Sequence, residues 1–519
     1  MEVPSLSRRS SSGLSAPSFK KSRTSLLRVV PPPPPREFFN ISRADLIRAV
    51  PTKNFLHSPE VLSTSIGTDA DYERSERCEQ IGTFISHNWG CSGTMKWLGL
   101  VYHFHNRAVW FAALALVVLF EGLTIYFGWT TFEWRQVSSS GEVVVVGVFG
   151  PAIFCLPPII ALVFLLSARW TPACLLPEGG CFLDKCSISQ TDNQLKSASI
   201  RQLGGYIAKS KAFLLVGEYG YLERLWCMYE LAIFAAANNF SFDTLQTVQL
   251  DAIRWALFLF VFVTANNILA VPLMCSVFGS VQWNMWTLEA VPSALMRFML
   301  NLSVFTLLLS GTFVFPMYVL YHVLQASEEQ YGKLRERVKH FSVKRLRCTV
   351  EADRSFVIDE INKYFGDLDT FEQFVVDWLW PDFMERQYGR SRSSIVSYPL
   401  FMTAHMPHMI VALDFFLVTL TLRADDGERG NALCAFNLWM LGFVFVWIPV
   451  ATRLATSTIL WVRGLPIHSE KAKSMLAIGI STILYSLLCA FNVAVNPDIP
   501  QVTLTVIYTC MAVMIWYTW

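Results

Sequence analysis

The stretch "AFLLVGEYGYLERLWCMYELAIF", residues 212–234, decides the fold of a large part of this chain. It opens with a brief apolar run, AFLLVG, which is typical of a buried parallel strand. The segment that follows has helical spacing and carries Glu230 one turn after Trp226. Its apolar stripe consists of Leu222, Leu225, Tyr229, Ala232 and Ala236. We therefore predict a strand and then an amphipathic helix with an acid and an indole on one face.

A second strand and helix precede this pair. CFLD, residues 181–184, is another brief apolar run. The sequence after it places Ile200, Leu203 and Ile207 at helical spacing. The order strand, helix, strand, helix predicts a parallel α/β sheet, because parallel strands need a crossover between them.

Two strands are too few for a sheet, and IGTFISHNW, residues 81–89, supplies a third. Apolar side chains such as Phe84 and Phe213 have no partner within their own short segments, and burial of each contributes about 1.5–3 kcal/mol. We therefore expect residues 83–86 to lie beside or within one strand of residues 212–217.

Polar residues end all three predicted strands. Ser86 and His87 end the first, Asp184 the second, and Glu218 follows the third. Ligands of doubly wound sheets bind beyond the carboxyl ends of the strands. We expect a ligand site there, with Glu230 facing it.

The composition of the whole chain is that of a membrane protein. Of 519 residues, 53% are hydrophobic and 16% are charged, whereas a soluble domain has about a quarter of its residues charged. The twelve cysteines are scattered without a Cys-x-x-Cys pair, which indicates reduced thiols and not a disulfide framework.

Eight apolar runs approach the roughly 20 residues that a helix needs to cross a bilayer. They cover residues 108–127, 143–167, 253–279, 297–325, 406–422, 432–452, 474–494 and 500–518. The loops on one side hold nearly all of the basic residues, which identifies the cytosolic side. We predict a multi-pass integral membrane protein with both termini in the cytosol; the sequence does not identify the membrane.

The chain divides into a polytopic α-helical membrane part of about eight spans and a small cytosolic α/β domain. In chain order, we predict a disordered tail (1–75), the first part of the α/β domain (76–106), a transmembrane hairpin (107–167), the second part of the domain (168–252), spans three and four (253–325), a cytosolic helical module (326–405) and spans five to eight (406–519).

The predicted tail is rich in Ser, Arg and Pro. Its five prolines, Pro31–Pro35, favour a polyproline II helix. One interpretation is a solvated tail and the other is a ligand for an SH3- or WW-type partner. The partners expected elsewhere are the lipid bilayer and other copies of the α/β domain; we expect no nucleic acid.

Several of the quoted segments together resemble a TIR domain of the plant type, over about 100 residues. The resemblance is strongest in the Trp-Cys-x-x-Glu-Leu element behind a strand. The matching positions are Phe182, Asp184, Ile200, Leu203, Ser210, Tyr221, Trp226, Cys227, Glu230 and Leu231. The resemblance implies a flavodoxin-like parallel sheet and a role in signal transduction through self-association.

In enzymatic members of that family, the acid at the position of Glu230 is the catalytic residue of NAD⁺ cleavage. The resemblance therefore implies a possible NAD⁺ hydrolase with NAD⁺ as substrate, no separate cofactor and no metal. One carboxylate suffices because nicotinamide leaves as a neutral molecule and the transition state resembles an oxocarbenium ion. Ser86, His87 and Asp184 would bind NAD⁺ at the strand ends, and Trp226 would pack under its ribose or nicotinamide.

The chain also departs from the family. After Asn239 only about a dozen residues precede the third predicted span, so the last strands of a TIR domain are missing. We expect residues 326–405 or another subunit to cover the open edge of the sheet. A non-catalytic assembly scaffold, with Glu230 as a surface or cap residue, is therefore an alternative function.

A channel or transporter regulated by the α/β domain is the other alternative. Two acids, Glu121 and Asp414, lie inside the first and fifth predicted spans. Acids within spans are functional candidates, because a charge in the bilayer is costly unless it is used or paired.

Overall fold

The computed structural model describes residues 39–280 apart from 130–131, 138–142, 177, 218 and 239–243, most of 318–381, six residues within 406–417, and 448–494. The fourth, fifth, sixth and eighth predicted spans lie wholly or largely outside the described residues, and so do Pro31–Pro35.

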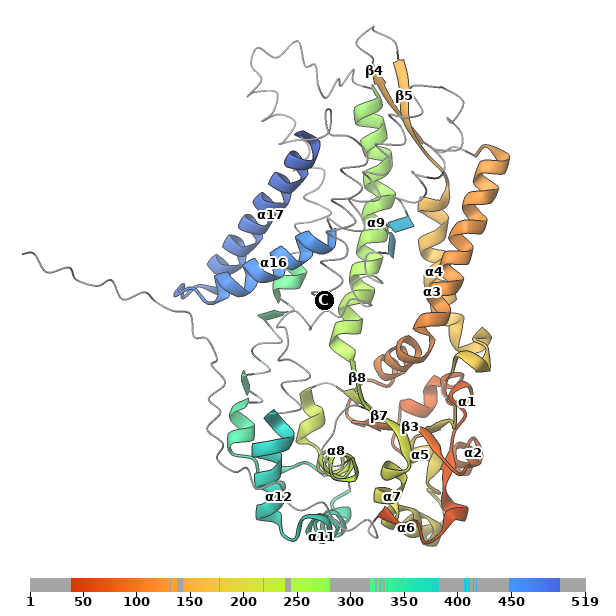
Figure 1. Cartoon of the computed structure of the whole chain (residues 1–519), viewed down its shortest axis with the longest axis vertical. Coiled ribbons are helices and arrows are strands. Elements are labelled where there is room, and N and C mark those ends of the chain that lie inside the picture. Colours follow the sequence, from red (N-terminus) through yellow and green to blue (C-terminus); the bar gives the residue numbers. More distant parts are fainter. Residues whose placement is uncertain are drawn as a thin grey trace, which may run out of the picture.

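A parallel sheet of four strands forms the centre of the α/β domain (Figure 1). Its order is β6 (Cys181–Phe182), β3 (Ile81–His87), β7 (Ser210–Gly217) and β8 (Leu245–Gln249), and each neighbouring pair is parallel. Phe84 of β3 lies opposite Phe213 of β7. The predictions of a parallel α/β sheet and of residues 83–86 beside 212–217 are confirmed.

The fourth strand, β8, is absent from the sequence prediction. It pairs with β7 and runs without a loop into the helix α9 (Leu250–Ser280). Val248 at the end of the strand and Ile253 in the first turn of the helix share one buried cluster. The strand was missed because its five residues directly precede a long apolar run, so they were assigned to the flank of the third predicted span.

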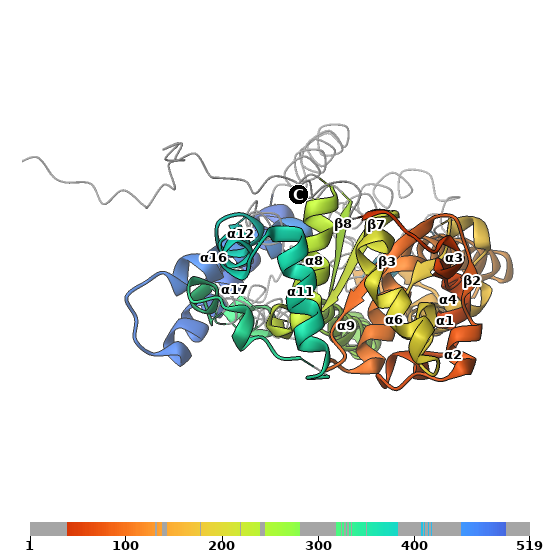
Figure 2. The same ribbon diagram turned by 90° about the horizontal axis from the view of Figure 1, so that it is seen from below.

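Helices cover both faces of the sheet (Figure 2). Successive strand residues point to opposite faces. Phe84 therefore packs with α7 (Leu203–Ala208) and α8 (Leu225–Ala237), and Ile85 packs with the first turns of α3 (Gly93–Phe127). The ring of Phe84 stacks between those of Phe182 and Phe213, with centroids at 4.7 and 5.4 Å.

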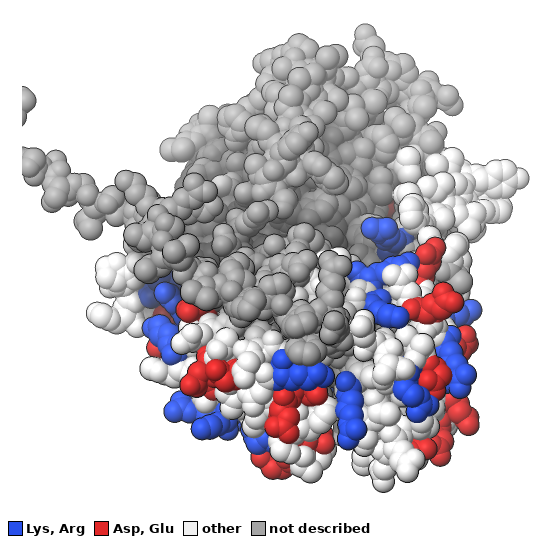
Figure 3. Space-filling view, turned by 60° about the horizontal axis from the view of Figure 1, so that its bottom comes forward, with Lys and Arg blue, Asp and Glu red and all other residues white. Residues whose placement is uncertain are grey.

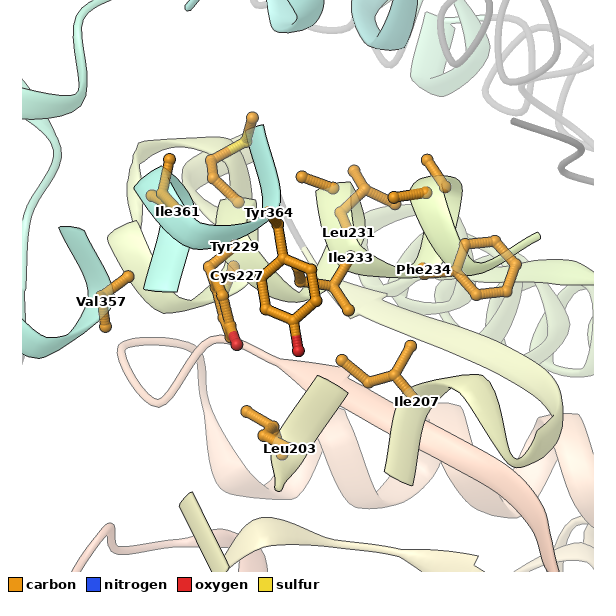
Figure 4. Close-up of a cluster of buried hydrophobic side chains, with 14 of the residues drawn as sticks. Leu203, Ile207, Cys227, Tyr229, Leu231, Ile233, Phe234, Val357, Ile361 and Tyr364 are labelled. Atoms are coloured by element: carbon orange, nitrogen blue, oxygen red, sulfur yellow. The ribbon is translucent and has the colours of Figure 1, made fainter. Parts of the chain in front are cut away.

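Helix α8 is buried on nearly all sides, so the prediction of an amphipathic helix is wrong. Figure 4 shows Tyr229 and Ile233 of α8 beside side chains of α7 and of a helix from far along the chain, α11 (Asp353–Phe365). The next helix, α12 (Leu368–Phe374), extends this cover. The described part of the module predicted at residues 326–405 therefore covers α8. Cover of the open edge of the sheet by the rest of the module or by another subunit stays a prediction.

Residues 39–75 are ordered, which corrects the predicted disordered tail 1–75. The segment contains β1 (Arg48–Ala49), α1 (Thr52–Leu56) and α2 (Asp69–Glu73). Val50 and Cys181 exchange backbone hydrogen bonds of 2.7 and 2.8 Å, which ties the segment to β6. Its buried apolar residues are spaced irregularly among polar ones, so no period marked them in the sequence.

A helical hairpin separates the two halves of the domain. Helix α3 is 35 residues long and starts inside the predicted first half; it packs against α4 (Ala152–Trp170). At the far end, β4 (Phe132–Val137) and β5 (Val143–Phe149) pair antiparallel (Figure 1). Residues 143–149 were predicted as part of a helical span. They form a strand instead, in keeping with the β propensity of four consecutive valines.

In the described part of the chain, one helix, Gly93–Phe127, is long and apolar enough to cross a membrane. Helix α4 contains a shorter apolar stretch, Phe154–Ser167. Two further long helices, α16 (Ile448–Arg463) and α17 (Glu470–Ala494), follow near the end of the described residues. The eight spans stay a prediction.

Candidate functional site

Ser86 and Glu230 meet at the carboxyl end of the central strand. All seven residues of β3 are buried, and Ser86, 1% exposed, points to the face that α8 covers. Its hydroxyl donates a hydrogen bond to the carboxylate of Glu230. The acid of α8 therefore lies at the edge of the sheet where the sequence placed a ligand site.

A short chain of hydrogen bonds continues from this contact. The Ser86 hydroxyl is 2.6 Å from the phenol oxygen of Tyr221, and that phenol donates to the backbone carbonyl of Cys227 at 3.3 Å. Each hydroxyl has one proton to donate. With Glu230 ionised, Ser86 donates to it; with Glu230 protonated, the acid can donate to Ser86, Ser86 to Tyr221, and Tyr221 to Cys227. The protonated form thus satisfies every acceptor.

Burial raises the pKa of Glu230 to about 8. The hydrogen bond from Ser86 acts in the opposite direction, and the negative charge of Asp184 adds to the increase. No Lys or Arg forms an ion pair with Glu230 among the described residues. The acid is therefore mostly neutral at pH 7, and a cation bound beside it would favour its ionised form.

Asp184 lies at the end of the neighbouring strand β6, as predicted, and begins the short helix α5 (Asp184–Ser187). One of its oxygens accepts the indole N–H of Trp89 at 3.0 Å, and the other accepts the backbone N–H of Lys185 at 2.7 Å. Its charge raises the pKa of Glu230 and opposes the lowering of the pKa of His87. Asp184 therefore links the two sides of the site electrostatically.

His87 points away from Glu230, because it follows Ser86 on the strand. Burial lowers its pKa to about 4, which leaves the imidazole neutral at pH 7. Its ring packs edge-on against Trp89, with centroids 4.4 Å apart. Its Nε2 has no hydrogen-bond partner in the described part of the chain. His87 can supply a hydrogen-bonding nitrogen to the site and no positive charge.

The structure does not bring Trp226 into the site. Its indole N–H donates to Asp353 at 3.4 Å, and its ring packs against Tyr229 and Phe356 with centroids at 5.8 and 6.2 Å. The expectation that Trp226 lines the same cleft as Glu230 is therefore corrected. The start of α11 lies against the first turn of α8, and its residues Asp353 and Phe356 contact the indole.

Sequence reasoning missed the aromatic residue that does lie at the strand ends, Trp89. Besides its contacts to Asp184 and His87, its ring lies under the ammonium group of Lys96, 4.6 Å from the centroid. Lys96 is itself 1% exposed and reaches the carbonyl of Asn88 at 3.5 Å. The signal in the sequence was the tryptophan that directly follows the polar end of the predicted strand, at the end of IGTFISHNW.

The arrangement combines a half-buried acid that is mostly neutral at pH 7, a hydroxyl donor and a second carboxylate at one sheet edge. Such a set can hold a proton, or present a negative centre to a cationic ligand. The described residues contain no group of three His, Cys, Asp or Glu side chains placed to hold a metal. Comparisons of the chain with family models, with curated proteins and with solved structures found no match.

Proposed function

We propose that the α/β domain is a TIR-like signalling domain that hydrolyses NAD⁺, with Glu230 as the catalytic carboxylate. The observation that carries the proposal is the contact between Glu230 and Ser86 at the carboxyl edge of a parallel sheet. It supports the proposal because this edge is where doubly wound sheets bind nucleotides. Self-association of the domain stays a prediction.

The raised pKa of Glu230 suits a cationic substrate. The nicotinamide ring of NAD⁺ is positively charged, and a positive charge a few ångströms from a carboxyl group lowers its pKa. Binding would therefore ionise Glu230 when the substrate is in place. The carboxylate would then oppose the positive charge that develops on the ribose.

In the reaction, the bond between ribose C1′ and the nicotinamide nitrogen breaks, and its electron pair leaves with nicotinamide. The ribose becomes an oxocarbenium ion beside Glu230. Water then adds to C1′ and loses a proton, which gives ADP-ribose. Ser86, which donates to Glu230, would hold the carboxylate in one orientation through both steps.

The direct test is NAD⁺ consumption by the purified full-length protein in detergent or nanodiscs. Glu230→Gln should abolish turnover, because it keeps the shape of the side chain and removes its charge. Glu178→Gln is the matched control, because Glu178 is 90% exposed and pairs with Lys211 at 3.5 Å. Equal turnover by the Glu230→Gln protein would remove Glu230 from the mechanism. A folded wild-type protein without turnover would favour the assembly scaffold.

We also propose that the helical part crosses a membrane eight times, with the α/β domain and both termini in the cytosol. The outward face of α3 supports a membrane crossing by this helix, because it exposes large apolar side chains: Phe111 66%, Leu114 59%, Val118 63% and Leu119 60%. Such a continuous apolar surface is rare on a soluble protein. Single cysteines in residues 128–142 should resist a membrane-impermeant label applied from the cytosolic side, and cysteines at both termini should react. Termini on opposite sides would exclude an even number of spans.

A further inference from the structure

Two acids from separate predicted spans meet inside the helical part. Glu121 belongs to α3, and Asp414 comes from a segment 293 residues further along the chain. Their side chains are 1% and 0% exposed, and the two carboxyl groups lie close enough to interact electrostatically. Two buried carboxyl groups this close together do not both ionise without a compensating cation, so the pair holds at least one proton when no cation is bound.

The surroundings satisfy one of the four carboxyl oxygens. Asp414 Oδ2 accepts the backbone N–H of Gly150 at 2.8 Å, just before the first turn of α4. In the described part of the chain, Asp414 Oδ1 and both oxygens of Glu121 have no hydrogen-bond donor. Buried oxygens without a donor are costly, which points to a ligand that these oxygens can share.

Thr124 adds a fourth oxygen to the set. It is 0% exposed, and its hydroxyl has no hydrogen-bond partner in the described part of the chain. It follows Glu121 by three positions, so both lie on one face of α3. The Cα–Cβ bond of a helical residue tilts toward the helix N-terminus, which turns the Thr124 side chain back toward Glu121.

The walls around this set are apolar. The neighbouring buried cluster joins α3, α4, α9 and the segment that carries Asp414. Its members are Ala113, Val117, Ala152, Leu156, Ile160, Phe260, Met406 and Ile410. Among the described residues, Asp414 is the charged group that acts electrostatically on Glu121. Asp414 interacts with Glu121 and with the backbone N–H groups of Gly150 and Ala152 at the start of α4. No basic side chain of the described residues therefore balances the pair.

We propose that Glu121, Asp414 and Thr124 form a site at which a proton and a monovalent metal cation compete. The pair is neutral in two states: with two protons, or with one proton and one monovalent cation. An apolar environment strongly favours neutral states. Entry of the cation therefore releases one proton, and the charge of the site does not change. The site is independent of the NAD⁺ chemistry proposed for Glu230.

The test uses the full-length protein in nanodiscs and Na⁺ as the probe, with K⁺ as a second probe. Binding is followed by calorimetry and by the infrared carbonyl band of protonated carboxyl groups. Na⁺ should reduce that band in the wild-type protein. The apparent affinity for Na⁺ should fall about tenfold for each unit by which the pH is lowered, in the range where the pair holds two protons. The reason is that one proton competes with one cation.

Glu121→Gln and Asp414→Asn should each abolish Na⁺ binding and the infrared change. Asp251→Asn is the control, because Asp251 is 40% exposed and pairs with Arg254 on the surface of α9. If a variant fails to fold, the wild-type pH series still tests the proposal. Binding that is absent in the wild-type protein, independent of pH, or retained by both acid variants would overturn it.

Discussion

The α/β domain and helix α3 are built with opposite polarity. In the domain, Phe84 and Phe213 are buried within the sheet, and charged side chains of both signs cover the outer face (Figure 3). In α3, Glu121 and Thr124 are buried while Phe111 and Val118 are exposed. The same physical rule gives both patterns, because each region buries the groups that its surroundings solvate poorly. This contrast is the one that the proposed membrane crossing predicts, with water around the domain and lipid around the helix.

The two acid sites also differ: Glu230 is half-buried, whereas Glu121 and Asp414 are fully buried. Glu230 is mostly neutral at pH 7 and lies beside the Ser86 hydroxyl, which can donate to it once it ionises, with a second hydroxyl, Tyr221, behind Ser86. Glu121 has no hydrogen-bond donor among the described residues, and the charged group that acts on it there is another acid, Asp414. Ionisation of Glu230 therefore needs only a rearrangement of hydroxyl protons. Ionisation at Glu121 needs a replacement cation.

The largest expected difference between the regions is in stability. Phe84→Ala should reduce the free energy of unfolding of the domain by about 3–5 kcal/mol, because it empties the stack between Phe182 and Phe213. Phe111→Ala removes the same side chain from the 66% exposed face of α3 and should change the stability of the domain by less than about 0.5 kcal/mol. Thermal unfolding and trypsin resistance of the full-length protein measure both. Similar losses for the two variants would contradict the contrast.

The next effect is the pH dependence that Glu230 gives to the domain. Its pKa is about 8 in the folded chain and near 4.5 when unfolded, so its contribution is full below pH 4.5 and is lost as the pH rises through 8. Between pH 6.5 and 8 the free energy of unfolding should fall by about 1.5 kcal/mol. His87, with its lowered pKa, destabilises the fold only below about pH 6.5, so it does not contribute in this window.

Glu230→Gln should remove this slope, since an amide does not titrate in the window. Denaturant unfolding at fixed pH values, with Glu178→Gln as control, provides the measurement. A slope that persists in the Glu230→Gln protein would assign it to another group.

A smaller effect concerns the donor to Glu230. Ser86→Ala removes the hydrogen bond that holds down the pKa of Glu230. The ascending limb of kcat/KM against pH for NAD⁺ cleavage should therefore move to higher pH by about one unit, because a hydrogen bond to a charged group contributes about 1.5–3 kcal/mol. Ser86→Thr keeps the hydroxyl and should restore the profile. An unmoved profile with lower activity would make Ser86 a packing residue only.

The sequence could predict those parts of the fold that depend on local period. The runs at 81–89, 181–184 and 212–217 are short, apolar and end in polar residues. These features were enough to predict the parallel sheet and the meeting of Ser86 with Glu230. They could not show which distant segment covers a given face. Helix α11 buries the outer side of α8, and residues 39–75 extend the edge at β6. Both errors concern long-range contacts that leave no periodic signal.

The smallest expected effect is the difference between two tryptophan variants, one at the predicted site residue Trp226 and one at Trp89, which lies at the strand ends. Trp226→Phe removes a hydrogen bond of 3.4 Å to Asp353 on α11 and keeps most of the ring contact with Tyr229. It should lower the free energy of unfolding by less than about 1 kcal/mol and leave kcat and KM for NAD⁺ unchanged.

Trp89→Phe is the matched variant, because it removes the indole N–H that Asp184 accepts at 3.0 Å. Without that donor the Asp184 charge is less well satisfied and acts more strongly on Glu230, so NAD⁺ cleavage should weaken although stability falls by a similar amount. Kinetics and unfolding of the two variants side by side give the answer. If Trp226→Phe impairs cleavage and Trp89→Phe does not, the substrate lies against α11 and the site at the strand ends is misplaced.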